Sequence, residues 1–208
     1  MSAPQEGPYD WWILSQLGEH RRVVVRLWIP RRVMIVLGRF GDARYDLHLE
    51  ALDPGVVIKQ RLGGGGTVVL DPQVPVLEAG FWSKSRKPLQ AYARWLGDPL
   101  CRTLRRLGVP VRLRQDWFDY VVGDRKVAGS TFYLARERVI YGVSLVYART
   151  TVDRMERYLR LPRRQPAYRA GRRHRDFVQP LEAWGVAFED LVQALEALVQ
   201  RLQQEPPP

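Results

Sequence analysis

The stretch RLGGGGTVVLD, residues 61–71, places four consecutive glycines between an arginine and a run of residues typical of a β-strand. Glycine loses more conformational freedom on folding than any other residue, so four in a row are costly unless the backbone must do what side chains forbid. The run is compatible with a flexible turn between strands. It is also compatible with a backbone that lies close to an anionic ligand, with N–H groups directed at the anion and Arg61 beside it.

Composition limits the class of protein. Of the 208 residues, 46% are hydrophobic and 26% charged, which is ordinary for a globular domain. No apolar run approaches the roughly 20 residues that a membrane helix needs, and the polar start MSAPQEGPYD is unlike a signal peptide, so a cytoplasmic protein is expected. A single cysteine, Cys101, excludes an internal disulfide, and three scattered histidines give no metal-ligand spacing, so no metal site is expected.

The charge is strongly positive, at +11, and is carried by 29 arginines against four lysines. Such a surface favours anionic partners, which include nucleotides, acidic proteins and nucleic acid. The basic run RRQPAYRAGRRHR, residues 163–175, has the composition of a segment that follows a phosphate backbone. It is equally typical of a solvated loop in an arginine-rich protein, and we favour that interpretation over nucleic-acid binding.

Strands and helices are mixed along the chain without the regular alternation of a doubly wound sheet. The order predicts an α+β domain with a mixed or antiparallel sheet, a single domain over residues 1–203, and a disordered tail at 204–208. β-Branched runs predict strands within residues 21–30, 31–40, 55–60, 67–71, 109–114, 118–134 and 138–148. Apolar spacing predicts helices within residues 9–18, 46–52, 87–108, 151–161 and 188–202, and a proline-containing basic loop at 162–176.

Lys126 is notable because nearly all positively charged residues of this chain are arginines. It follows a predicted hairpin turn at Gly123 and Asp124, which places it on the next strand. Its compact ammonium has three donors, which suit a phosphate or a carbonyl oxygen that gains charge during a reaction. A solvated lysine on a strand is the alternative interpretation.

Three blocks in order, LGRF, RLGGGGTVVLD and YVVGDRKVAGS, make the chain resemble the lipoate–protein ligase and octanoyltransferase family. That family shares its fold with biotin–protein ligases, and the resemblance covers roughly residues 20–185. A later stretch, PAYRAGRRHRDFV, is similar to one found in single-domain members. The positions that match the family's motifs are Gly38, Arg39, Arg61, Gly64, Gly65, Gly66, Asp71, Arg125, Lys126, Val127, Ala128, Gly129 and Ser130.

The resemblance implies a curved mixed or antiparallel sheet flanked by helices, with Lys126 as the catalytic residue. It implies that the acyl group or acyl-adenylate is bound by Gly38, Arg39, Arg61, Gly64, Gly65, Gly66, Asp71, Gly129 and Ser130. The implied substrates are lipoate or octanoate with ATP and Mg²⁺. The implied acceptor is a lysine of an acidic lipoyl carrier domain, of the dehydrogenase E2 or glycine-cleavage H type. We expect no C-terminal accessory domain, so a separate accessory protein would supply one, or a preformed adenylate would be used.

Four positions depart from the family pattern and keep other functions open. Leu70 replaces a histidine, Gly63 a serine, Tyr141 a histidine, and Phe40–Gly41 stands where a glutamine is common. These losses favour, as the alternative, a non-catalytic homologue that binds an acyl ligand or a carrier protein. Transferases of the family use an acyl-cysteine, and residues 111–116 and 136–141 contain none. This favours the adenylate route over octanoyl transfer, and the glycine motif is unlike that of biotin ligases. The sequence leaves the oligomeric state open.

Overall fold

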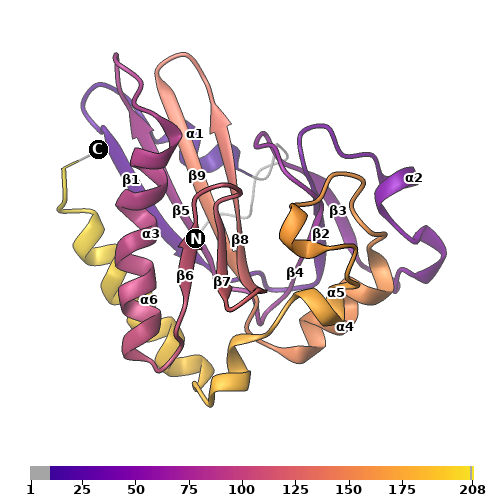
Figure 1. Ribbon diagram of the computed structural model, residues 1–208. Helices are drawn as coiled ribbons and strands as arrows, with labels where there is room; N and C mark the ends of the chain where they lie inside the picture. The colour runs from indigo at the N-terminus through magenta and orange to yellow at the C-terminus, as the bar shows by residue number, and fades with distance from the viewer. Residues whose placement is uncertain (1–9, 207) are drawn as a thin grey trace.

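The computed structural model describes residues 10–206 and 208, and Figure 1 shows two sheets with helices packed around them. The larger sheet has six strands in the order β1-β5-β9-β8-β7-β6, and every neighbouring pair is antiparallel. Its strands are β1 (Val23–Trp28), β5 (Val76–Trp82), β6 (Arg112–Arg114), β7 (Asp119–Val122), β8 (Arg125–Leu134) and β9 (Arg138–Leu145).

The smaller sheet has three strands in the order β3-β2-β4, and it is mixed: β2 is parallel to β3 and antiparallel to β4. Its strands are β2 (Met34–Leu37), β3 (Val57–Gln60) and β4 (Val68–Leu70). Residues 61–67, which we call the glycine loop, connect β3 to β4. The α+β class with a mixed and antiparallel sheet is therefore confirmed.

Helices cover both sheets. In Figure 1, α3 and α6 lie side by side against one face of the larger sheet, and α4 and α5 lie beside the smaller sheet. The α-helices are α1 (Trp11–Ser15), α2 (Ala43–Asp46), α3 (Leu89–Arg106), α4 (Arg149–Tyr158), α5 (His174–Phe177) and α6 (Phe188–Leu202). Three short 3₁₀ helices are η1 (Leu49–Ala51), η2 (Ala167–Arg169) and η3 (Leu181–Trp184).

The C-terminal helix follows its predicted stripe. The side chains of Leu191, Leu195, Leu198 and Leu202 recur at three- and four-residue spacing and are all buried in the main core. Helix α3 is equally close to its prediction and continues through Pro99, which lacks the N–H for one intrahelical hydrogen bond. Both helices bury their apolar faces against the larger sheet, so this part of the core could be read from sequence periodicity.

Strand β5 was not visible in the sequence pattern, although it is central in the larger sheet. It pairs with β1 on one side and β9 on the other, and all seven of its side-chain positions are buried. A strand buried on both faces has no alternation of polar and apolar residues. A charged residue, Glu78, also interrupts the apolar run that would otherwise indicate a buried strand. Its carboxylate forms an ion pair with Arg26 and accepts a hydrogen bond from Trp28 Nε1 at 3.1 Å.

Two other local predictions need correction. The range 46–52, expected to be a helix, holds only the last residue of α2 and the short 3₁₀ helix η1. The loop expected at 162–176 contains η2 and most of α5. The end of the chain also makes a defined contact, because Trp95 Nε1 donates to the carbonyl of Pro206 at 2.7 Å. The single-domain boundary at residue 203 stays a prediction. Within residues 10–206 and 208, no helix is both long and apolar enough to cross a membrane.

Candidate active site

Arg61 organises the glycine loop. Its side chain is buried, and its Nη2 donates to the carbonyl oxygens of Gly64 at 2.9 Å and Gly66 at 2.7 Å. Its Nη1 donates to the carbonyl of Val36 in β2 at 3.3 Å. Since these bonds turn the loop's carbonyls inward, the observed contacts give Arg61 a role in shaping the loop. Its predicted contact with a ligand phosphate stays a prediction.

The loop is fastened to β8 and to the end of β2. The hydroxyl of Thr131 donates to the carbonyl of Gly64 at 2.8 Å, and the N–H of Gly64 donates to the carbonyl of Phe132 at 3.1 Å. The N–H of Arg39 donates to the carbonyl of Gly63 at 2.9 Å. The structure therefore places the glycine loop against the same strand that carries Lys126.

Asp10 holds the start of the loop, and no sequence signal pointed to it. Its carboxylate is almost fully buried and accepts hydrogen bonds from the N–H groups of Leu62 at 2.9 Å and Gly63 at 3.3 Å. Burial raises the pKa of Asp10 above its ordinary value, and these hydrogen bonds oppose that shift by stabilising the ionised form.

Gly38 and two of the four loop glycines, Gly63 and Gly65, occupy positions where packing or backbone conformation disfavours a side chain. A β-carbon at Gly38 would lie 2.0 Å from the carbonyl oxygen of Gly65, and one at Gly63 would lie 2.3 Å from the hydroxyl of Thr131. Gly65 has a φ of +95°, which disfavours a side chain. The absence of the family's serine at position 63 therefore has a steric reason, because a larger residue would collide with Thr131.

The other two loop glycines face open space. A β-carbon at Gly64 or Gly66 would meet nothing within 4 Å, and neither residue has a positive φ. The N–H groups of Gly65 and Gly66 have no hydrogen-bond partner among the described residues. Because this backbone carries no side chains and its N–H groups make no hydrogen bond, it can approach a ligand closely and bind an anion.

Lys126 lies near the start of β8 and is partly exposed. Its Nζ forms an ion pair with Asp119 Oδ1 at 2.7 Å, and the other carboxylate oxygen of Asp119 accepts a hydrogen bond from the hydroxyl of Tyr168 at 2.6 Å. The side chain of Lys126 lies over Gly129, where a β-carbon would be 2.9 Å from both Cε and Nζ. Gly129 thus leaves the space that the lysine occupies.

Ser130 and Asp71, two further predicted site residues, have structural partners. Ser130 Oγ donates to the carbonyl of Phe118, a non-glycine residue with a φ of +53°. The Asp71 carboxylate is fully buried and accepts hydrogen bonds from Thr151 Oγ1 at 2.8 Å and Arg154 Nη1 at 2.6 Å, which ties the end of β4 to α4. The structure brings Ser130 next to the glycine loop, whereas the carboxylate of Asp71 binds α4 and the N–H of Gln73 in its own turn. Ligand binding by either residue stays a prediction.

Two family polar positions are filled by core residues in this chain. Leu70 is buried with Val36, Val74 and Val76. Tyr141 is fully buried, with its hydroxyl 3.0 Å from that of Tyr120. Each replacement therefore adds to packing.

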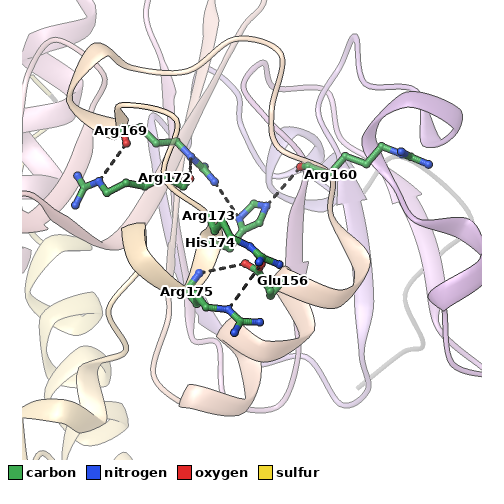
Figure 2. Close-up of polar contacts among 7 residues, drawn as sticks. All are labelled: Glu156, Arg160, Arg169, Arg172, Arg173, His174 and Arg175. Atoms are coloured by element: carbon green, nitrogen blue, oxygen red, sulfur yellow. Dashed lines mark hydrogen bonds and ion pairs between the residues drawn. The ribbon is translucent and has the colours of Figure 1, made fainter.

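The arginine-rich run 163–175 is only partly the solvated loop that we expected, because buried side chains and short helices interrupt its exposed positions. Arg169 and His174 are buried, and Arg173 and Arg175 both pair with Glu156 (Figure 2). Arg172 pairs with Asp124 at 2.9 Å, in the turn before Lys126. Arg172, Arg173 and Arg175 thus tie the segment to acidic residues elsewhere in the protein.

The buried His174 sits in a cationic environment, as Figure 2 shows. Arg169 Nη2 lies 3.4 Å from Nδ1, and because arginine can only donate, Nδ1 accepts and the proton is on Nε2, which faces the carbonyl of Arg160 at 3.4 Å. Burial first, and then the Arg169 guanidinium, lower the pKa of His174 from 6.5 to about 4. The imidazole is therefore neutral at pH 7.

This pKa shift predicts a loss of stability in mild acid. Between pH 6.5 and 4 the unfolded chain takes up a proton on His174 that the folded chain refuses, so stability falls with falling pH, by about 3 kcal/mol in total. His174→Gln should remove this slope, because the amide can still face the Arg160 carbonyl. Urea unfolding at pH 7 and 4.5 would measure this dependence of the free energy of unfolding on pH.

The exposed His20 provides the matched control, since His20→Gln should leave the pH dependence of stability unchanged. Equal pH dependence in both variants would contradict the prediction.

Cys101 lies in α3 as a packing residue. It is buried in the main core, and burial raises the pKa of its thiol to about 11, so almost no thiolate is present at pH 7. We expect alkylation of the folded protein at pH 7.5 to be slower than that of the urea-unfolded chain by at least about 100-fold. Equal alkylation rates in the folded and the unfolded protein would contradict this placement of the thiol.

Asp119 and Tyr168 are the site neighbours that sequence reasoning missed. Asp119 had a usable signal: the turn at Gly123 and Asp124 fixes the pairing of Val121 with Lys126, and Asp119 shares a face with Val121 two residues away. A bulge between Tyr120 and Val121 adjusts this register locally. Tyr168 had no such signal, because only the tertiary fold brings the arginine-rich segment to β7. Among residues 10–206 and 208, no cluster of three or more His, Cys, Asp or Glu side chains could hold a metal ion.

Comparison with known proteins places this architecture. Residues 8–200 match the family of lipoyl protein ligase A/B catalytic domains, and the chain belongs to that family. A curated protein of Aeropyrum pernix, provisionally named lipoate-protein ligase A, is 29% identical over 119 residues, which are 57% of this chain. The match spans 44% of that relative's length.

Solved structures of lipoate protein ligases share the fold. The bipartite lipoate protein ligase of Thermoplasma acidophilum, from a structural study with its E2 lipoyl domain, superposes with a TM-score of 0.77 at 17% identity, covering 96% of this chain and 78% of that one. A ligase from the same organism with bound lipoic acid gives 0.75 at 17% identity, with 93% and 78% covered. A lipoate-protein ligase A bound with ATP gives 0.75 at 16% identity, with 95% and 87% covered.

Proposed function

We propose that this protein transfers a lipoyl or octanoyl group from an acyl-adenylate to a lysine of an acidic lipoyl carrier domain. The observation that carries the proposal is the placement of two features on one strand. The open backbone at Gly64 is fastened to Thr131 of β8, and Lys126 lies five residues earlier on β8 with its ammonium over Gly129.

The chemistry of these groups suits an acyl-adenylate. The undonated N–H groups of Gly65 and Gly66 can bind phosphate oxygens at close range, because neither residue has a side chain in the way. The ammonium of Lys126 can stabilise the acyl oxygen as negative charge develops on it. Mg²⁺ would accompany ATP through the phosphates of the nucleotide. Both carboxylate oxygens of Asp119, the acid beside Lys126, are already bound by Lys126 and Tyr168.

Charge supports an acidic acceptor. The net charge of +11 would attract an acidic carrier domain over long range. Arg163 and Arg164 are exposed and lie over the rings of Tyr45 and Trp117, at 5.2 and 5.6 Å from the ring centroids. Exposed arginine and aromatic side chains of this kind are enriched in protein interfaces.

An intact-mass assay on an acidic lipoyl carrier domain tests the proposal. One reaction contains lipoate or octanoate with Mg-ATP, and a parallel reaction contains preformed lipoyl-adenylate. A mass shift of the carrier in both means that activation and transfer reside in this chain, and a shift with the adenylate alone means that activation needs a separate accessory protein. If the carrier gains mass only when biotin replaces lipoate in the reaction, the acyl group that the protein transfers is biotinyl. No shift with a folded protein would refute the transfer and favour a non-catalytic binding homologue.

A further inference from the structure

A chain of hydrogen bonds joins the arginine-rich segment to Lys126. The hydroxyl of Tyr168 donates to one carboxylate oxygen of Asp119 at 2.6 Å, and the ammonium of Lys126 binds the other at 2.7 Å. The side chain of Asp119 is 7% exposed, whereas that of Lys126 is 28% exposed. Since little water reaches Asp119, these two partners determine how its carboxylate is oriented.

The ring of Tyr168 is itself held on two sides. The guanidinium carbon of Arg114 lies 4.3 Å from the ring centroid, and the ring of Phe177 is centred 5.2 Å away. Burial, and then the neighbouring Asp119, raise the pKa of the Tyr168 phenol, so its proton is present to be donated. Tyr168 therefore has a fixed ring and a defined donor.

The segment that carries Tyr168 is fastened around the start of β8. Arg172 forms an ion pair with Asp124 at 2.9 Å, and its guanidinium also donates to the carbonyl of Tyr168 at 2.8 Å. The N–H of Gln179 donates to the carbonyl of Lys126 at 2.8 Å. Residues 168–179 thus contact the backbone of Lys126 directly and its side chain only through Asp119.

We propose that Tyr168 is a positioning residue for Lys126, acting through the carboxylate of Asp119. The proposal rests on the proposed function, in which Lys126 contacts the acyl group. With the hydroxyl in place, the carboxylate has one orientation, and the ammonium is held over Gly129. Without it, the carboxylate can rotate and the flexible lysine side chain can leave this position. The arginine-rich segment would therefore set the geometry of the reactive lysine.

The four lysines of the chain allow a direct test. Reductive methylation with formaldehyde and borohydride, followed by peptide mass spectrometry, gives the labelling rate of Lys126 with Lys59, Lys84 and Lys87 as internal standards. Tyr168→Phe removes only the hydroxyl and keeps the ring. We expect Lys126 to be labelled about 10-fold faster, as a lost hydrogen bond to a charged group would allow, with the other three rates unchanged.

Tyr158 provides a matched control, because its hydroxyl donates to Asp53 at 2.5 Å in another tyrosine–carboxylate pair. Tyr158→Phe should leave the labelling of Lys126 unchanged. In the carrier assay, Tyr168→Phe should lower kcat by about 10-fold and leave KM for the carrier unchanged. Lys59, Lys84 and Lys87 are exposed in the fold, so urea unfolding of Tyr168→Phe is the folding control: a role in folding alone would make the gain in Lys126 labelling follow the fraction of unfolded protein.

Unchanged labelling of Lys126 in Tyr168→Phe would overturn the proposal, whatever happens to activity. If that variant fails to fold, Asp119→Asn decides, because it should accelerate labelling of Lys126 to the same extent, and an unchanged rate would again overturn it. Failure of the proposed function is a separate result: full transfer by a Lys126 variant would remove the lysine's role in transfer, while selective labelling would still establish the contact through Asp119.

Discussion

Under the proposed function, replacing Lys126 by arginine should lower lipoyl transfer from a preformed adenylate by about 10²–10³-fold, the usual effect of losing a group that stabilises developing charge. Arginine keeps the positive charge that Asp119 needs, so the fold should persist. Its planar, bulkier guanidinium cannot replace a compact ammonium held over Gly129, where space is limited. Intact-mass kinetics on the carrier domain, together with thermal unfolding, would separate the two effects.

The control for this experiment is Lys84→Arg. Lys84 is an exposed lysine that pairs with Glu19 at 3.1 Å, so the substitution makes the same chemical change at the surface. Its transfer rate should match that of the unmodified protein. We chose arginine over alanine at position 126 because alanine would also leave the nearly buried Asp119 without its cation and thereby destabilise the protein. A Lys126→Arg variant with undiminished transfer would exclude the lysine from the chemistry.

Alanine substitutions in and beside the glycine loop should divide into two groups. At Gly38 and Gly63 the new β-carbon would lie 2.0 and 2.3 Å from oxygen atoms, so Gly38→Ala and Gly63→Ala should each destabilise the fold by about 1–3 kcal/mol. The cost should be larger at Gly38, where the oxygen belongs to the backbone. At Gly64 and Gly66 the β-carbon meets nothing, so stability should stay within about 1 kcal/mol.

The second group is the informative one for function. A methyl group on the open side of Gly64 or Gly66 would occupy the space through which we propose the acyl-adenylate approaches. Transfer should therefore fall by about 10–100-fold in these stable variants, since small displacements of a reactive group are costly. Urea unfolding and the carrier assay measure the two quantities on the same samples. Full activity of both Gly64→Ala and Gly66→Ala would show that no ligand lies over this part of the loop.

The structure also explains why four glycines occur together. Gly63 and Gly65 satisfy internal needs, namely contact with Thr131 and a positive φ, whereas Gly64 and Gly66 face open space. The sequence offered a turn and a ligand contact as alternatives. In the fold the run contains both features: two glycines that packing requires and two that remain available for a ligand.

What the sequence by itself determined is local. Periodicity predicted α3 and α6, β-branched runs predicted most strands, and the resemblance of the glycine and lysine motifs to known sequences predicted the family. The helices and strands depend on neighbours within about one turn or one strand, so they are readable in order along the chain. The hairpin before Lys126 even contained enough register information to find Asp119.

The tertiary structure decided the rest. Strand β5 is buried on both faces, so its place at the centre of the larger sheet leaves no alternating pattern to read. Arg61 and Asp10 hydrogen-bond to the backbone of the glycine loop, and Tyr168 hydrogen-bonds to Asp119, which is 49 residues away in sequence. Such contacts join segments that are distant in sequence and depend on how the two sheets and the arginine-rich segment pack. Local propensity contains no information about that packing, so only the folded chain could reveal how its lysine is held.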